Sequence, residues 1–413
     1  MATTAMEASR RVLPPRAQFA RARGLRRRRA SAPPRSSRAP LDAVALFRAD
    51  ADDFELLRSL GQVSYAVEGS AERTLTWTGG EDGSVPDSFS VSGSGGVAAG
   101  DAVMKLYAGK VIGWDDGGER SNAVPDVLLK EYVNAAAAPM ADAEVEAYMA
   151  LYGDPRDSTI GQRWDGVPVG EPFDPASLPV VPLVAFFSSR PVGGAPDGPG
   201  SLWTVQAWGP GGLTRLADYP ARRQEPSEAK WWPPVQRVRD TGFGPRHRFA
   251  RNAIRGVFAA VAAVHRRGVA HNAIDATSFQ LNTTDDQQAD DVEVRLMNFG
   301  FAAPLTEETR RGDVRAAAVV AAEIVFGAFA LGGPDHRTSA ASLARLFERV
   351  FALDPKQARE YCVEEPDWAS AVEFWDYRDR QGDGWAILTD AWRGDASAED
   401  ILARLEAIET PYD

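Results

Sequence analysis

Cysteine and histidine are scarce in this 413-residue sequence, and their scarcity limits the chemistry that the chain can carry. The single cysteine, Cys362, excludes an intrachain disulfide framework and a cysteine-rich zinc site. The four histidines are scattered between His247 and His336 without the spacing of metal ligands. Long apolar runs are also missing, because the most apolar stretch, residues 316–333, contains Glu323 and ends in Gly-Gly. We therefore expect no membrane span.

Acidic residues are nearly absent from the first forty positions. This segment holds eleven arginines against one acid, Glu7, so its charge of +10 leaves −22 on residues 41–413 out of a net charge of −12. The segment is rich in Ala, Ser and Pro, and it lacks the apolar run of a secretory signal. The composition predicts a disordered transit peptide over residues 1–40 and a chloroplast location, with the mitochondrion as the alternative. A nuclear signal at residues 26–29 is the competing interpretation, and the acidic remainder disfavours nucleic acid as a partner.

The period of the apolar residues changes along the rest of the chain. Residues 86–206 contain short apolar runs separated by Gly, Pro and Asp, with a helical interval at residues 135–152. Residues 207–413 are mainly helical in pattern. These features predict a fold of the α+β class, with a small β-rich unit that carries one helix followed by a larger, mainly α unit. Residues 41–85 are expected to be an N-terminal extension.

The stretch that begins at residue 264 carries the most specific pattern in the chain. It reads VHRRGVAHNAIDATSFQLN at residues 264–282 and VRLMNFGFA at residues 294–302. This arrangement resembles the protein kinase superfamily, in which an apolar helix leads into H-R-D-L-K-P-x-N-I-L and then into D-F-G. The matching positions are His265, Gly268, His271, Phe279, Leu281, Leu296, Phe299 and Gly300. A chance match of a helix, a loop and a hairpin is the competing interpretation.

The resemblance implies a two-lobed kinase-like fold, with the β-rich unit as the N-lobe and the α unit as the C-lobe. Residues 202–220, LWTVQAWGPGGLTRLADYP, also resemble the hinge of the thylakoid kinase branch, which agrees with a chloroplast address. The apolar helix after Asp313 resembles the buried central helix of the C-lobe.

The resemblance also implies a degenerate reaction centre. Phosphoryl transfer requires a carboxylate that orients the substrate hydroxyl and side chains that hold Mg²⁺. Ala273 occupies the position of the family's catalytic Asp, Asp275 that of its Lys, and Ser278 that of its metal-holding Asn. Asn298 replaces the metal-binding Asp and is a weak metal ligand, so we expect Mg²⁺ binding to be weak or absent. No catalytic set is intact, and Asp275 is the one nearby carboxylate that offers a substitute base.

The nucleotide-binding residues implied by the resemblance are a lysine and a glutamate. Lys130 in DVLLKEYVN resembles the family's nucleotide lysine, and Glu144 is its expected partner, with Glu146 as the runner-up. Lys105 in AVMKLY competes with Lys130, although its spacing to Glu144 is less suitable. The alternative is an ordinary solvated lysine and a surface glutamate.

A glycine-rich loop over the phosphates is suggested by FSVSGSGGVAAG, in which Gly93 and Gly95 match G-x-G and Ala98 stands where a third Gly is expected. A flexible connector explains the same residues.

From these patterns we expect a protein kinase-like protein that is a catalytically impaired pseudokinase, binds ATP, and acts as a plastid scaffold or regulator for an unidentified protein partner. One alternative is an active serine/threonine kinase with displaced catalytic residues. Another is an adaptor that binds no nucleotide.

Overall fold

The computed structural model describes residues 47–49, 51–65, 75–78, 102–112, 127–152, 177–189, 200–208, 214–220, 235–330, 338–379 and 384–407. The chain divides between Pro40 and Leu41, and the second unit, Leu41–Asp413, is compact. The predicted transit peptide over residues 1–40 lies outside the described residues. Within the second unit, the described residues form a mixed α+β structure, as the sequence predicts.

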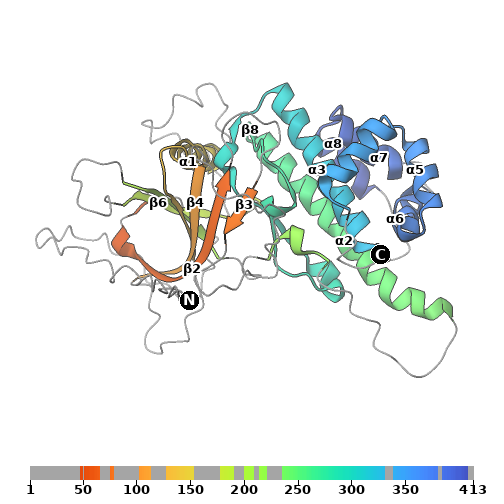
Figure 1. Cartoon of the computed structure of the whole chain (residues 1–413), viewed down its shortest axis with the longest axis horizontal. Helices are drawn as coiled ribbons and strands as arrows, with labels where there is room; N and C mark the ends of the chain where they lie inside the picture. The colour runs from red at the N-terminus through yellow and green to blue at the C-terminus, as the bar shows by residue number, and fades with distance from the viewer. Residues whose placement is uncertain are drawn as a thin grey trace, which may run out of the picture. The chain divides into compact units, whose positions relative to one another are not determined.

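The largest sheet of the described structure has seven strands in the order β1-β6-β7-β5-β4-β2-β3 (Figure 1). Neighbouring strands are antiparallel, except for β1 and β6, which are parallel. Alternation of buried and half-buried residues along β4, with Ala102, Met104 and Leu106 buried, is typical of a strand that packs on one face. The strands are β1 (Phe47–Arg48), β2 (Phe54–Tyr65), β3 (Leu75–Thr78), β4 (Ala102–Val111), β5 (Val127–Tyr132), β6 (Leu183–Ser188) and β7 (Leu202–Ala207).

The predicted boundary between an extension over residues 41–85 and the β-rich unit is wrong, because β1, β2 and β3 belong to this sheet. β2 pairs with β4 from Phe54 opposite Val111 to Tyr65 opposite Ala102. The register shifts twice along this pairing, and each shift interrupts the alternation that marks a strand in sequence. The irregular pattern of residues 54–65 therefore concealed a long strand.

Helix α1 (Ala138–Tyr152) lies on the sheet and confirms the helical interval predicted for residues 135–152 (Figure 1). The turn before it is held by Asn134, whose Oδ1 atom accepts hydrogen bonds from the backbone N–H groups of Val103 and Ala137, both at 3.1 Å. Apolar residues of α1, among them Val145 and Tyr148, are buried in the core. α1 therefore has a fixed face toward the strands.

The remaining described residues are mainly helical, and the apolar spacing after residue 246 is confirmed as the buried face of α2. Ile254, Val257, Phe258, Val261 and Val264 are all buried. Residues 316–328 of the predicted apolar stretch lie in α3, which is a core helix, and none of the described helices is long and apolar enough to cross a membrane. The longer helices are α2 (Val235–Arg266), α3 (Glu307–Ala328), α5 (Pro355–Glu364), α6 (Ala369–Asp379), α7 (Gly384–Arg393) and α8 (Ala398–Glu406), and the short α4 (Ala340–Ala344) precedes α5.

Two small antiparallel pairs join α2 to α3. β9 (Phe279–Leu281) pairs with β10 (Val294–Leu296), and β8 (Val269–Ala270) pairs with β11 (Ala303–Pro304). These pairings bring the loop after β8 next to the loop after β10. The two loops contain His271, Phe299 and Gly300, three of the residues on which the kinase resemblance rests.

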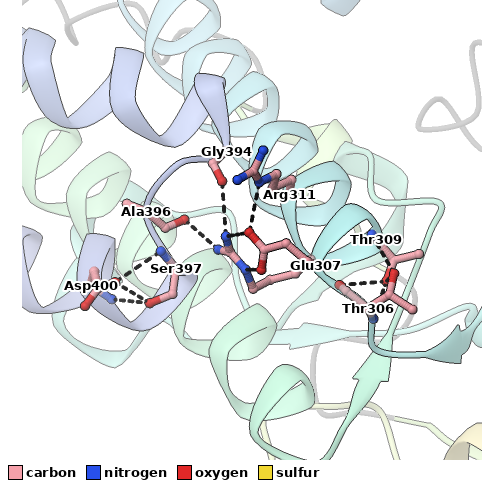
Figure 2. A network of polar contacts seen from close by, with 9 residues as sticks. Thr306, Glu307, Thr309, Arg311, Gly394, Ala396, Ser397 and Asp400 are labelled. Carbon is pink, nitrogen blue, oxygen red and sulfur yellow. Dashed lines mark hydrogen bonds and ion pairs between the residues drawn. The ribbon is translucent and has the colours of Figure 1, made fainter.

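The beginning of α3 is tied to the turn before α8 by polar contacts (Figure 2). Thr306 caps the helix through its side chain. Glu307 accepts hydrogen bonds from the guanidinium of Arg310 at 2.7 and 2.9 Å and from that of Arg311 at 2.9 Å, and these contacts lower the pKa of Glu307 to about 2. Arg310 also donates to the carbonyl oxygens of Ala396 at 3.0 Å and Gly394 at 3.4 Å. The helix that carries Asp313 is thereby anchored at its N-terminal end.

Candidate functional site

A fully buried carboxylate, that of Glu144 on α1, is the centre of the candidate site. Its Oε1 atom accepts hydrogen bonds from Lys130 Nζ at 2.7 Å and from Gln206 Nε2 at 2.8 Å. Its Oε2 atom accepts from the Tyr132 hydroxyl and, at 3.4 Å, from Thr204 Oγ1. A buried charge is costly unless it is paired and hydrogen-bonded. Glu144 meets both conditions, because one ammonium and three neutral donors surround it.

The strand pattern explains why these donors converge. Lys130 and Tyr132 are two residues apart on β5, so they lie on the same face of the sheet. On the neighbouring β7, Thr204 lies opposite Lys130, and Gln206 lies on the same face two residues further along. α1 packs on that face with Glu144 directed inward. The sequence analysis missed Thr204 and Gln206 as partners of Glu144. The signal that could have indicated them is the presence of polar residues at two alternate positions of the apolar run LWTVQA.

Lys130 makes a second contact that links the sheet to the loop after β10. Its Nζ atom donates to Asn298 Oδ1 at 3.0 Å. Asn298 adopts a left-handed backbone conformation with φ 70° and ψ 55°, which asparagine tolerates better than most residues. The structure thus brings together three residues that the sequence singled out, Lys130, Glu144 and Asn298, although 168 positions separate the lysine from the asparagine.

The competing lysine and glutamate lie elsewhere. Lys105 is half-buried on β4, where it lies opposite Glu131. Glu146 is half-buried and lies two residues beyond Glu144, which places it on a different side of α1. The carboxylate that contacts Lys130 is that of Glu144, with the lysine side chain 1% exposed and the glutamate side chain 0% exposed. An exposed, solvated pair is therefore wrong for these two residues.

A second buried carboxylate, that of Asp313 on α3, holds the loop after β8. It accepts hydrogen bonds from the backbone N–H groups of His271 at 2.7 Å and Asn272 at 2.8 Å, and it lies 3.1 Å from His265 Nε2. Asn272 has a φ of 61°, so the loop reverses sharply at this point. Asp313 therefore fixes the position of the loop that contains Ala273.

Within this loop, Asp275 acts as a cap. Its Oδ1 atom accepts from the backbone N–H and the hydroxyl of Thr277, and likewise from the backbone N–H and the hydroxyl of Ser278, at 2.7 to 3.0 Å. Asp275 thus begins the 3₁₀ turn η6 (Ala276–Ser278). The single hydroxyl proton of Ser278 is shared between Asp275 Oδ1 and the carbonyl oxygen of Ala273, which also lies 3.0 Å from Ser278 Oγ. The side chains of Asp275, Thr277 and Ser278 are therefore engaged in holding the shape of this loop.

An aromatic column connects the two parts of the site. The rings of Tyr148 and Phe299 are 5.1 Å apart, and those of Phe299 and His271 are 5.0 Å apart, both edge to face. His271 donates from Nε2 to the carbonyl oxygen of Met297 at 2.8 Å, and its Nδ1 atom accepts from the backbone N–H of Ala273 at 3.3 Å. This pattern requires the neutral imidazole. Burial lowers the pKa of His271 below its ordinary value.

We expect the protein to lose stability as the pH falls below about 6.5, the ordinary pKa of histidine, because the unfolded chain then gains a proton that the folded His271 resists. The contribution of His271 to the free energy of unfolding is complete above that pH. It decreases as the pH falls, until the pH reaches the lowered pKa of the folded state. Urea unfolding at pH 7.5 and pH 5.5 measures the change. His271→Gln should reduce the difference between the two pH values, and an unchanged difference would assign the effect to other groups.

Two predictions about ligands concern the glycine-rich loop and the holding of a metal ion. Gly93 and Gly95, the predicted glycine-rich loop, lie outside the described residues. No group of three or more His, Cys, Asp or Glu side chains is arranged to hold a metal ion in the part of the chain that the structure describes.

Comparisons with known proteins identify no relative of this chain among protein-family models or curated proteins. No protein-family model matches the chain, and no curated protein sequence matches it.

Proposed function

We propose that the chain is a kinase-like protein of the pseudokinase type, two-lobed, which binds ATP without efficient phosphoryl transfer and acts as a plastid scaffold or regulator for a protein partner. The observation that carries this proposal is the buried contact of Lys130 with both Glu144 and Asn298. A lysine held in this way presents an ammonium at a fixed point, and an ammonium is a suitable partner for a phosphate group. The Ala-, Ser- and Arg-rich residues 1–40 support the plastid address.

The surroundings of Ala273 support the catalytic impairment. Ala273 offers no carboxylate, and its carbonyl oxygen accepts a hydrogen bond from Ser278. Asp275, the substitute base in the alternative hypothesis, is exposed and uses Oδ1 as a helix cap. A general base must reach the proton that it removes. A side chain engaged as a cap is poorly prepared for that task.

ATP binding is tested by the thermal unfolding of the full chain. A nucleotide at 100 times its dissociation constant should raise the free energy of unfolding by about 2.7 kcal/mol. Lys130→Ala should abolish the shift, because the ammonium that meets the phosphates is lost. Lys105→Ala is the matched control and should leave the shift nearly unchanged. The unfolding temperature of each variant without ATP shows whether its fold is intact.

The same preparations separate the alternatives. If millimolar ATP gives no shift, the adaptor without nucleotide binding replaces our proposal. If radiolabelled phosphate is transferred well above background and Asp275→Ala removes the transfer, the chain is an active kinase with displaced residues.

A further inference from the structure

The orientation of the Asn298 amide is set by Lys130. A lysine ammonium has three N–H donors and no acceptor, so an amide at 3.0 Å must turn its oxygen toward it. The Nδ2 group of Asn298 then lies on the opposite side of the amide, with two N–H donors directed away from Lys130. The Asn298 side chain therefore presents N–H donors to a ligand. A metal ion would instead require a free oxygen at this position.

Burial determines which of these groups a ligand can meet. Lys130 and Glu144 are almost fully enclosed, with side chains 1% and 0% exposed. Asn298 is half-buried. Asn298 is therefore the member of this cluster that is partly accessible to solvent, and its Oδ1 atom contacts the enclosed ammonium.

Lys130 retains capacity for a second anion. Two of its three N–H donors are engaged, by Glu144 and Asn298. The Glu144 carboxylate is also stabilised by the neutral donors of Tyr132, Gln206 and Thr204. Because these neutral donors also stabilise the carboxylate, the positive charge of Lys130 can interact with a ligand as well.

Mg²⁺ does not fit this arrangement. Mg²⁺ requires oxygen ligands in near-ideal geometry and is usually held through one or two carboxylates. The one side-chain oxygen of Asn298 is already engaged by a cation, and the carboxylate of Glu144 is enclosed among four donors.

We propose that the Asn298 amide and Lys130 form an oxyanion site that takes a phosphate group free of metal. This inference deepens the proposed function and rests on it for the nucleotide part. It implies that ATP binds more tightly without Mg²⁺ than with it, because the metal occupies the phosphate oxygens that the two donors need.

Calorimetric titration of the full chain with ATP, and separately with pyrophosphate, tests the inference in EDTA and in excess Mg²⁺. We expect both probes to bind at least about tenfold more tightly in EDTA, since the loss of one hydrogen bond to a charged group weakens binding by about ten- to a hundredfold. Asn298→Asp keeps an acceptor for Lys130 and replaces the N–H donors by a carboxylate oxygen. In EDTA, the affinity of this variant for both probes should be about tenfold lower, since the hydrogen bond from the amide N–H to the phosphate is lost. Addition of Mg²⁺ should increase its affinity. Gln288→Glu, an exposed amide-to-carboxylate change, is the matched control and should behave as the original chain.

The outcomes separate this inference from the proposed function. If Mg²⁺ tightens ATP binding to the original chain, the oxyanion site is wrong while the nucleotide pocket stands. If pyrophosphate binds in the expected manner and ATP does not, the oxyanion site stands and the nucleotide pocket is wrong. If neither probe binds in EDTA, or if Asn298→Asp leaves both affinities unchanged, the oxyanion site is overturned.

Discussion

Glu144→Ala should destabilise the protein by about 3–5 kcal/mol, because removing one partner of a buried ion pair leaves the other charge uncompensated. In this variant the Lys130 ammonium stays buried with the neutral Asn298 oxygen as its remaining partner. The hydroxyls of Tyr132 and Thr204 and the amide of Gln206 lose their common acceptor as well. Urea unfolding of the full chain measures the loss.

Lys130→Met should cost less than Glu144→Ala, because three neutral donors continue to stabilise the carboxylate. Glu146→Ala, on the same helix at a half-buried position, is the matched control and should cost less than about 1 kcal/mol. A double change to Glu144→Leu and Lys130→Met should recover part of the stability, since apolar residues often replace a buried pair without loss. If Glu144→Ala costs no more than the control, the carboxylate is not enclosed as described here.

Asp313→Ala should destabilise the protein by roughly 3–5 kcal/mol, because each buried donor left unsatisfied costs about 1–3 kcal/mol. The backbone N–H groups of His271 and Asn272 lose their acceptor together, and His265 loses its contact. Amide hydrogen exchange at His271 and Asn272 should accelerate along with the loss of stability measured in urea.

Two variants test this reading of Asp313. Asp313→Asn keeps one carbonyl oxygen and should fall between the original chain and Asp313→Ala. Asp290→Ala, a change at a carboxylate with a 76% exposed side chain, should alter stability by less than about 0.5 kcal/mol. Unchanged exchange at His271 in Asp313→Ala would show that the loop is held by other contacts.

Local patterns in the sequence predicted a substantial part of this architecture. The helical spacing of α2 and the interval that became α1 followed from apolar periodicity, which depends on neighbouring residues alone. The contact between Lys130 and Glu144, which are 14 positions apart in the sequence, was expected from the resemblance to the kinase superfamily.

Other features depend on long-range pairing and were not predictable in the same way. Gln206 contacts Glu144 across 62 positions, and this contact exists because β7 lies beside β5. The inclusion of β2 in the sheet was hidden by its register shifts, which disturb the two-residue period. The contact of Asp313, on α3, with the backbone of His271 joins residues 42 positions apart and was not predicted from the sequence.

The ends of the sheet have a consequence for how the protein behaves at high concentration. β1 at one edge has two residues and β3 at the other has four. Exposed strand edges template pairing with other chains, and short edge strands are one means by which proteins limit it. The parallel pairing of β1 along β6 covers Ala185 and Phe186, which would otherwise lie on an open strand edge. Removing β1 should therefore promote aggregation by intermolecular strand pairing before it affects the cluster around Glu144.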